Sequence, residues 1–523
     1  MNTPHVLIVG AGPTGMTLAI ELRRAGLDVR VIDKSDHPAL HSQALVLQAR
    51  TLEQLQRYGV ADKAVARGRK LKRAELWSEG KQIVSIPLER IPSRYPYVLF
   101  LPQSETESIL NECMESLGVR AERRTELISF LDHGEGIAAK LRLPSGAEER
   151  MTTRWIVGCD GAHSLVRSAA GIPFEGGGIG LSFFLGDLEL EGADVPEDAL
   201  AIHLHRGNVV FLGRLSERFT RVIVALHSRQ GEAAKSEVSV ADFQQAMDEA
   251  GMRARILSSD WMTPFHVNDL QARHYRAGNA FLAGDASHIH SPVGGQGMNT
   301  GMQDAANLAW KLAAVARGAD DSLLDSYEEE RGAVGKALLR FTERTLKMAT
   351  ATNPLVQSLR DALLPIASSL TSVQEGMLGF VSETAIHYRE SSIVEDCGGD
   401  GTLRAGDRMP DLSIGEEDTG TSLFEGWRDP RHLALLLNST VEAKDRIASR
   451  LTHVQVVSIR LSELGDEGRA LLGKEEKVLI VRPDGYVGFR APMSKHAELE
   501  AYALREALRP SIEPRKEEVW QTM

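Results

Sequence analysis

The hydrophobic and polar positions of the first 33 residues predict a strand, a helix and a second strand. Val6–Val9 form an apolar run typical of a parallel strand that is buried on both faces. The motif GAGPTG follows at residues 10–15, and a helical pattern then continues to Gly26. A second apolar strand leads to Asp33. This order predicts a dinucleotide-binding unit, with the glycines at the pyrophosphate and Asp33 at a ribose hydroxyl.

A second pattern, at residues 281–304 (FLAGDASHIHSPVGGQGMNTGMQD), places a glycine-rich loop directly before a helix. We expect this helix to begin near Asn299, because small and apolar residues recur at helical spacing from there. Its free N–H groups and partial positive charge would lie at the bottom of the loop. A nicotinamide cofactor does not need such a loop. A flavin does, because its pyrimidine edge takes backbone N–H groups and carries negative charge when the flavin is reduced.

The remaining patterns alternate between strands and helices, so we expect an α/β protein with α+β elements. Its order of strands and helices after residue 397 resembles a thioredoxin-like domain, although no CxxC motif is present for redox exchange. The predicted parts are a discontinuous Rossmann-type nucleotide-binding domain (1–75, 98–178 and 266–345), an inserted β-sheet substrate domain (76–97 and 179–265), a helical linker (346–396) and the thioredoxin-like domain (397–523).

Composition narrows the class of protein. A length of 523 residues predicts two or three domains, and a net charge of −12 disfavours a nucleic-acid partner. The three cysteines form no CxxC pair, which fits a reducing cytoplasm. The N-terminal MNTPHVLIVG reads as a strand and not as a signal peptide, and no apolar run is long enough for a membrane span.

Three smaller patterns leave alternatives open. His203 and His205 alternate with apolar residues, so both lie on one face of a strand that either meets a substrate or faces solvent. Asp160-Gly161 follows a strand and is either a site of close backbone approach or a plain turn. His288 and His290 form an HxH pair without a third metal ligand nearby, so we expect no metal.

Three motifs together resemble the FAD-dependent aromatic hydroxylases, the class A flavoprotein monooxygenases, in their phenol hydroxylase-like branch. They are GAGPTG with Asp33, CDGAHSLVR at 159–167, and AGDASHIHSPVGGQGMNTGMQDAANLAWKLA from residue 283. ARTLE (49–53), LPQSETE (101–107) and the C-terminal domain agree with that branch. One departure is Gln43-Ala44, where many relatives have Arg-Ala.

The resemblance implies a tightly but non-covalently bound FAD, with NAD(P)H as transient electron donor and O₂ as cosubstrate. It implies that a flavin C4a-hydroperoxide transfers oxygen to a phenolic or polycyclic, polyketide-like aromatic substrate. Baeyer–Villiger or epoxidising oxygen insertion on the same fold is the first alternative. A non-enzymatic carrier built on the nucleotide-binding fold is the second. A homodimer is left open.

The resemblance also implies the site residues. The glycines of GAGPTG would take the pyrophosphate, Asp33 the adenosine ribose, and Asp285 the ribityl or pyrophosphate region. Asp160 and Arg167 would belong to a motif linked to both FAD and NAD(P)H. The cofactor-binding residues are expected to be Gly10, Gly12, Pro13, Thr14, Gly15, Asp33, Lys34, Gln43, Ala44, Gln103, Leu127, Asp160, Asp285, Pro292, Gly295, Gly297, Met298 and Asn299. The substrate-pocket candidates are His203, His205, Phe211, Arg214, Pro292, Val293 and Gly294. No motif fixes a catalytic residue.

Overall fold

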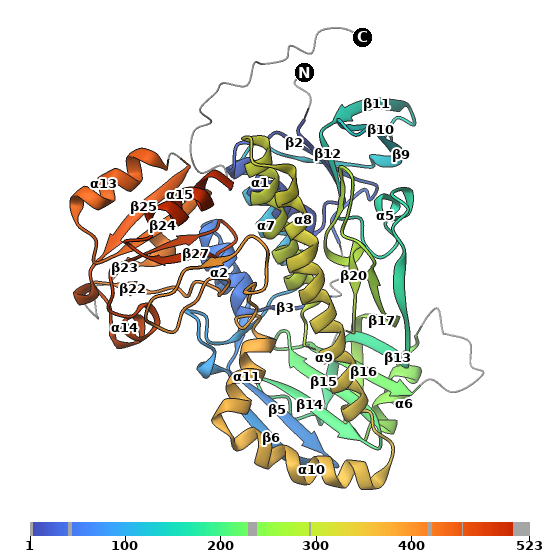
Figure 1. The fold of residues 1–523 in the computed structure, drawn as a ribbon. Helices are drawn as coiled ribbons and strands as arrows, with labels where there is room; N and C mark the ends of the chain where they lie inside the picture. The colour runs from blue at the N-terminus through green and yellow to red at the C-terminus, as the bar shows by residue number, and fades with distance from the viewer. Residues whose placement is uncertain are drawn as a thin grey trace. The chain divides into compact units, whose positions relative to one another are not determined.

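The computed structural model describes residues 4–39, 44–227, 238–291, 294–415, 421–451 and 453–505. The chain divides into two compact units, Met1–Ala306 with Glu328–Ile386, and Asn307–Tyr327 with His387–Met523. Both units combine helices with β-sheets, so the predicted α/β class is confirmed (Figure 1). The finer domain boundaries expected from the sequence stay a prediction.

The first unit is organised around a six-stranded sheet of order β18-β19-β12-β1-β2-β8. Its central strands run parallel: β2 (Val29–Asp33) and β12 (Trp155–Gly158) flank β1 (Val6–Val9), and β19 (Ala280–Leu282) follows β12. Helix α1 (Pro13–Arg24) connects β1 to β2, as predicted. Because parallel strands end at the same edge, the segments after β1, β2, β12 and β19 meet there.

An eight-stranded sheet forms the β-layer that the sequence predicts. Its two faces pack differently. One face packs against α6 (Val240–Glu249) around Phe243, and the other packs against Leu346 of α9 (Ala333–Ala349). In order, its strands are β20 (His288–Ile289), β17 (Arg255–Ala272), β13 (Phe174–Glu191), β16 (Thr220–His227), β15 (Asn208–Arg214), β14 (Ala199–His205), β5 (Arg73–Ser78) and β6 (Lys81–Pro87).

Two predicted helices have other bounds in the structure. The apolar spacing of ALVLQARTLEQLQRYG predicts one helix over residues 44–59. The structure has the shorter helix α2 (Ala49–Arg57), because Val46–Leu47 form strand β3 and pair with β7 (Val98–Phe100). In the linker, the prolines of Asn353-Pro354 and Leu364-Pro365 predict two helix breaks. The first is confirmed, because α10 (Pro354–Ser369) begins at Pro354, but this helix continues through Pro365, and α11 (Thr371–Val381) follows. A proline inside a helix removes one hydrogen bond, and here the helix continues despite that loss.

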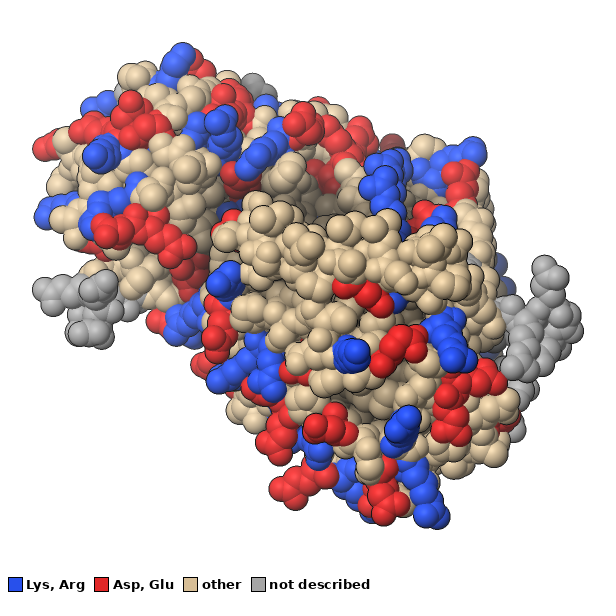
Figure 2. Space-filling view, turned by 90° about the horizontal axis from the view of Figure 1, so that it is seen from below, with Lys and Arg blue, Asp and Glu red and all other residues tan. Residues whose placement is uncertain are grey.

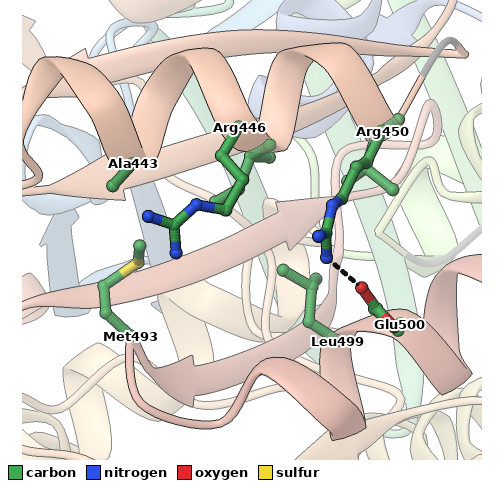
Figure 3. Close-up of a pocket in the computed structure, with 8 residues that line it drawn as sticks. Ala443, Arg446, Arg450, Met493, Leu499 and Glu500 are labelled. Atoms are coloured by element: carbon green, nitrogen blue, oxygen red, sulfur yellow. Dashed lines mark hydrogen bonds and ion pairs between the residues drawn. The ribbon is translucent and has the colours of Figure 1, made fainter.

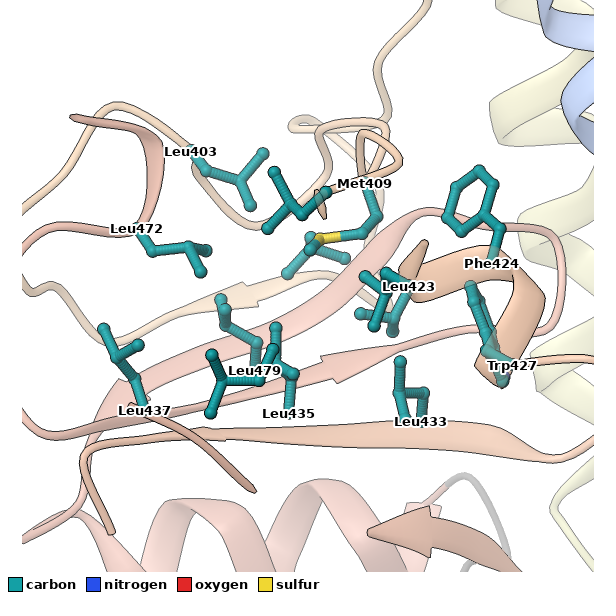
Figure 4. Close-up of a cluster of buried hydrophobic side chains, with 14 of the residues drawn as sticks. Leu403, Met409, Leu423, Phe424, Trp427, Leu433, Leu435, Leu437, Leu472 and Leu479 are labelled. Carbon is teal, nitrogen blue, oxygen red and sulfur yellow. The ribbon is translucent and has the colours of Figure 1, made fainter. Parts of the chain in front are cut away.

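The second unit contains a five-stranded sheet of order β21-β27-β26-β24-β25. Strands β24 (His432–Leu437) and β25 (Val454–Ile459) are parallel, and β26 (Lys477–Val481) is antiparallel to β24. Alternate residues of β24 and β26, with Leu403 and Met409 above them, form an apolar core (Figure 4). This order of strands agrees with the thioredoxin-like assignment, which stays a prediction.

The close packing of the first glycine turn gives a test of the fold. A Cβ atom at Gly15 would overlap the carbonyl oxygen of Gly10, whereas a Cβ at Gly12 meets no atom within 4 Å. We expect Gly15→Ala to lower the free energy of unfolding by about 1–3 kcal/mol, because overpacking displaces backbone. The matched control Gly12→Ala should stay within about 0.5 kcal/mol of the parent. Urea unfolding of the FAD-free protein measures both, and equal stability of the two variants would contradict this packing.

Candidate active site

The glycine turn after β1 is tightly packed on one side and open on the other. Gly10 has a φ of 106°, and a side chain there would overlap the carbonyl oxygen of Cys159 at the end of β12. Gly12 is the N-cap of α1, Pro13 takes the first helical position, and the space beside Gly12 is open. The turn therefore presents the N-terminus of α1 to an open space, which is the arrangement that binds phosphate groups.

Asp33 is held at the end of β2. Its carboxylate accepts hydrogen bonds from the N–H groups of Ala11 at 2.7 Å and Ser35 at 2.8 Å, and Arg123 lies 3.4 Å away. These contacts fix the carboxylate beside the glycine turn, where a ribose hydroxyl would reach it. Lys34 next to it is exposed.

Leu127 lies on a strand that begins near Asp33. It lies buried on β9 (Glu126–Asp132), and the N–H of Thr125, just before this strand, donates to the Asp33 carbonyl at 3.0 Å. Leu127 therefore lies two residues beyond a backbone contact with Asp33, and its place beside the cofactor stays a prediction.

Gln103 is the first residue of α4 (Gln103–Ser116) and joins two neighbouring segments. Its side-chain oxygen accepts from the Ala44 N–H at 3.3 Å, and its amide donates to Glu107 at 2.9 Å. Burial raises the pKa of Glu107. Gln43, where the sequence departs from its relatives, lies outside the described residues.

The carboxylate of Asp160 accepts hydrogen bonds from neighbouring residues of the chain. It accepts from the Ser164 hydroxyl at 2.5 Å and from the Leu165 N–H at 2.7 Å, so it fixes the start of α5 (Leu165–Ala169). Arg167 in that helix donates to the carbonyl oxygens of Ala286 at 3.1 Å and Ala162 at 2.8 Å. This motif therefore ties α5 to the segment that carries Asp285.

Asp285 follows β19 and lies in a hollow. Its side chain is exposed to solvent, yet the surrounding protein is dense enough that burial raises its pKa. His290 shows the same combination: solvent reaches part of it, while burial lowers its pKa to about 4. An exposed carboxylate in a crowded hollow can accept hydrogen bonds from the hydroxyl groups of a bound ligand.

Close backbone contacts explain the glycines around the start of α7 (Gly297–Ala316). A Cβ at Gly284 or Gly301 would lie 2.6 or 2.5 Å from the Thr14 hydroxyl, so only glycine lets α1, β19 and α7 meet there. Gly295 has a φ of 62° and packs against Val46. Because these residues are glycines, no side chain of theirs covers the backbone there.

Asn299 shapes the loop through its side chain. Its amide donates to the carbonyl oxygens of Val46 and Gly295, both at 2.8 Å, and its oxygen accepts from the Gln48 N–H at 2.9 Å. Gln48 in turn donates to the Gly294 carbonyl at 2.8 Å. Gly297 and Met298 form the first turn of α7, where backbone N–H groups have no partner within the helix. Pro292 and Val293 lie outside the described residues.

A buried ionic cluster lies beneath this helix start, and the sequence alone did not reveal it. Asp304 accepts from Arg331 at 2.6 Å, from His288 at 2.7 Å and from the Gly284 N–H at 3.1 Å. Burial alone would raise the pKa of Asp304, but Arg331 and His288 more than offset it and hold that pKa below its usual range. Arg331 also donates to the Thr300 carbonyl at 3.1 Å.

A second buried acid, Glu383, contacts the same turn of α7. It follows α11, accepts from the Thr300 hydroxyl at 3.0 Å, and accepts a short hydrogen bond from Gln303. Burial raises its pKa to about 8. Glu383 has a φ of 61°, a backbone conformation that a non-glycine residue adopts only at some cost. No local sequence pattern indicates this contact, because Glu383 and Thr300 lie far apart in the chain.

The β-sheet candidates do not converge on one face. His203 stacks on Trp77 with ring centroids 5.6 Å apart, and Trp77 packs on the cluster beneath α6. Arg214 donates to the Val195 carbonyl at 3.4 Å in that cluster, and a Cβ at Gly251, just after α6, would lie 2.8 Å from the His205 ring. His203 and His205 share a face, as predicted.

Phe211 lies on the opposite face. It pairs with Ile202 and Ile223, and all three pack on the side that meets α9. Directly paired residues of antiparallel strands point to the same face, so this register separates Phe211 from His203. The expectation that these four residues line one pocket is therefore corrected for His203, His205 and Arg214.

A charged pair that the sequence did not reveal lies on the Phe211 face. Arg221 pairs with both Gly213 and Asp187, and its guanidinium contacts the Asp187 carboxylate at 2.5 and 3.0 Å. A side chain at Gly213 would overlap the ring of Phe100, which pairs with Val46 under the glycine loop. Gly213, Phe100 and Val46 therefore form a chain of contacts from the Arg221–Asp187 ion pair to the glycine loop.

Other features lie apart from these residues. A pocket in the second unit lies between α13 (Val441–Arg450) and α15 (His496–Arg505) and is lined by Arg446, Met493 and Leu499, with an ion pair between Arg450 and Glu500 (Figure 3). It contains none of the expected site residues. In the described part of the chain, no group of three or more His, Cys, Asp or Glu residues could hold a metal ion. No helix in these described ranges has the length and apolar character of a membrane span.

Glu383 gives a pH test. Its pKa is about 8 in the folded protein and 4.5 for an ordinary glutamate, so only the unfolded chain loses this proton between those values. The contribution of Glu383 to stability is thus complete below pH 4.5 and falls as the pH rises through about 8. We expect wild type to lose up to about 1.4 kcal/mol per pH unit relative to Glu383→Gln in that window. Parallel unfolding curves at all pH values would contradict this assignment.

The arrangement fits FAD. An open helix N-terminus at Gly12 suits the pyrophosphate, Asp33 suits a ribose, and Asp285 in its hollow suits the ribityl hydroxyls. The backbone N–H groups at Gly295 and in the first turn of α7 would suit the edge of the flat flavin ring.

Comparison with known proteins agrees with this geometry. The FAD binding domain family model matches residues 3–342, and the aromatic-ring hydroxylase C-terminal family model matches residues 402–512. A 6-methylpretetramide 4-monooxygenase of Streptomyces rimosus is 34% identical, over 95% of this chain and 92% of that protein. A dialkyldecalin synthase of Streptomyces rugosporus is 30% identical, over 93% and 96%.

A solved structure shows the same fold over nearly the whole chain. OxyS anhydrotetracycline hydroxylase from Streptomyces rimosus has a TM-score of 0.81 and 29% sequence identity, and the match covers 98% of this chain and 100% of that chain. The chain therefore belongs to the family of FAD-dependent monooxygenases that combine this FAD-binding domain with an aromatic-ring hydroxylase C-terminal domain.

Proposed function

We propose that this monooxygenase hydroxylates a phenolic or polycyclic aromatic compound at the expense of NAD(P)H and O₂. The observation that carries the proposal is the apolar sheet face around Phe211, which holds one ion pair and leads to the glycine loop. Ile202, Phe211 and Ile223 offer a flat aromatic compound an apolar surface. The Arg221–Asp187 pair offers its hydroxyl groups polar contacts.

The proposed substrate lining combines this face with the glycine loop. It includes Phe211, Gly294 and the two loop residues that lie outside the described ranges, Pro292 and Val293. His203, His205 and Arg214 are not included, because they pack on the α6 side of the sheet. No side chain is assigned as a catalytic base.

The chain's own residues would hold the loop in place. The Asp269 carboxylate accepts from the Ser291 N–H at 3.2 Å, and the His290 Nδ1 contacts the Ser291 carbonyl at 2.8 Å. A carbonyl only accepts, so His290 carries its proton on Nδ1, and its low pKa keeps it neutral. Bound FAD supplies the redox chemistry and the activation of oxygen. Asp269 and His290 orient the segment that leads into the glycine loop.

Two other reactions fit the same fold. Oxygen insertion of the Baeyer–Villiger or epoxidising type would use the same cofactor site, and one relative is named a dialkyldecalin synthase and not a monooxygenase. The aromatic proposal is preferred because the C-terminal family model is that of aromatic-ring hydroxylases. A non-enzymatic carrier would not need Asp285 in its hollow beside the glycine loop. We also propose a cytoplasmic location, which the three free cysteines support.

A substrate screen tests the proposed reaction. We expect purified protein to be yellow, and phenols or polycyclic aromatic compounds to stimulate its oxidation of NAD(P)H. Mass spectrometry should show a product with one added oxygen atom. Protein that stays colourless after reconstitution with FAD would contradict cofactor binding. Yellow protein that consumes NAD(P)H equally fast with and without every aromatic compound would contradict the substrate class.

Asp285→Ala tests the cofactor site separately. We expect this variant to lose FAD during gel filtration, because acceptors for the ribityl hydroxyls are removed while no packed side chain is lost. The ratio of flavin to protein absorbance measures the loss, and circular dichroism checks the fold. Asp194→Ala, an exposed acid in the loop after β13, is the control and should keep its flavin. Unchanged flavin content in Asp285→Ala would overturn the assignment.

A further inference from the structure

The linker helices of the first unit carry an apolar stripe on their outer surface. Residues 359, 363, 366, 370, 373 and 377 are all large and apolar, and they recur in alternating steps of four and three. All six are exposed in the structure; Leu359 is 60% and Ile366 is 64% exposed. Leu355, one turn earlier in α10, is 80% exposed. Leu370 has an extended backbone and separates the two helices, so the stripe consists of residues 355–366 on α10 and residues 373–377 on α11. Within each helix the spacing is that of a seam by which one helix packs on another.

The opposite sides of these helices are already packed within the first unit. Arg360 of α10 is buried and donates to the carbonyl oxygens of Met348 and Ala349. Leu378 of α11 is buried, and Gln374 accepts from Arg90 at 2.6 Å. The exposed stripe is therefore a second, separate face of α10 and α11.

The stripe is nearly free of charge. Residues 354–381 contain three charged side chains, Arg360, Asp361 and Glu375. Arg360 is paired with Asp361 at 2.8 Å, and Asp361 also accepts from Ser78, which leaves Glu375 as the exposed charge outside this network. Figure 2 shows a broad uncharged band on the side of the molecule where α10 lies in Figure 1. Contiguous exposed apolar surface of this kind marks an interaction site.

We propose that this stripe, residues 355–377 on α10 and α11, is the contact surface between two copies of this chain. A helical seam needs a helix as its partner, and the same stripe on a second copy supplies one by two-fold symmetry. Each copy carries a net charge of −12, so an uncharged surface is where two copies meet without like-charge repulsion. The exposed apolar side chains amount to roughly 500 Å² or more. That is a large part of the roughly 800 Å² per partner in a standard interface.

A membrane surface fits the stripe less well. Helices that lie in a membrane interface carry Lys and Arg along the border of their apolar face. Arg360 is the single basic residue among residues 354–381, and it is buried and paired within the unit. The charge pattern thus favours a second copy of the chain.

The proposed interface is connected to the cofactor site. Gln296, directly before α7, donates to the Phe380 carbonyl at 2.9 Å at the end of α11. Glu383, two residues beyond α11, contacts Thr300 and Gln303 in the first turns of α7. A second copy that packs on α11 would thus support the segment that holds the start of α7.

The mass of the FAD-bound protein in solution tests the proposal. Sedimentation equilibrium over a range of concentrations should give twice the chain mass of 57.2 kDa. The double variant Leu359→Glu, Ile366→Glu should give the mass of one chain, because two copies would oppose buried like charges. Both side chains are exposed within one chain, so the variant should keep its fold and its flavin. Leu131→Glu, at a residue that is 66% exposed on β9, is the matched control and should stay dimeric.

Three results would overturn the proposal. They are a monomeric wild type at every concentration, a double variant as dimeric as wild type, and binding of wild type but not the double variant to phosphatidylglycerol vesicles. Hydrogen exchange keeps the test decisive if the variant aggregates. In wild type, exchange of residues 355–377 should slow as concentration rises, and exchange that is independent of concentration would contradict the interface.

Discussion

The start of helix α7 depends on a carboxylate and a guanidinium that are both wholly removed from water. Burying two such charges costs several kcal/mol each, and the cost is offset only when both groups are fully hydrogen-bonded. Asp304 meets that condition through Arg331, His288 and the N–H of Gly284, and Arg331 also reaches Thr300. Each contact goes to a different segment. One ionic cluster therefore fixes the Asp285 turn, strand β20 and the start of the helix relative to one another.

The buried acids near the start of α7 also determine the electrostatic charge at the place where a flavin would bind. Two acids, Asp304 and Glu383, lie beside the first turns of α7 and could cancel the positive end of that helix. Arg331 neutralises the first, and burial raises the pKa of the second to about 8, so Glu383 is mostly uncharged near pH 7. The helix N-terminus thus keeps its partial positive charge, which favours the negative charge of a reduced flavin.

Local patterns predicted the strand, glycine turn, helix and acid of the nucleotide-binding unit, because these elements are neighbours in sequence. They did not predict the substrate side. Whether Phe211 faces His203 or Arg221 depends on strand pairing, which alternation within one strand does not show. The contacts of Arg331 and Glu383 with α7 were missed for a related reason: each joins segments that only the fold brings together.

We propose that the chain inserts an oxygen atom from O₂ into an aromatic compound held between the glycine loop and the Phe211 face. The most direct test is a single turnover of the FAD-reconstituted enzyme with NAD(P)H, an accepted aromatic compound and isotopically labelled O₂. We expect one labelled oxygen atom in the product, bonded to a ring carbon as a hydroxyl. A product that contains no labelled oxygen, or one whose label lies in a ring-expanded lactone, would contradict it.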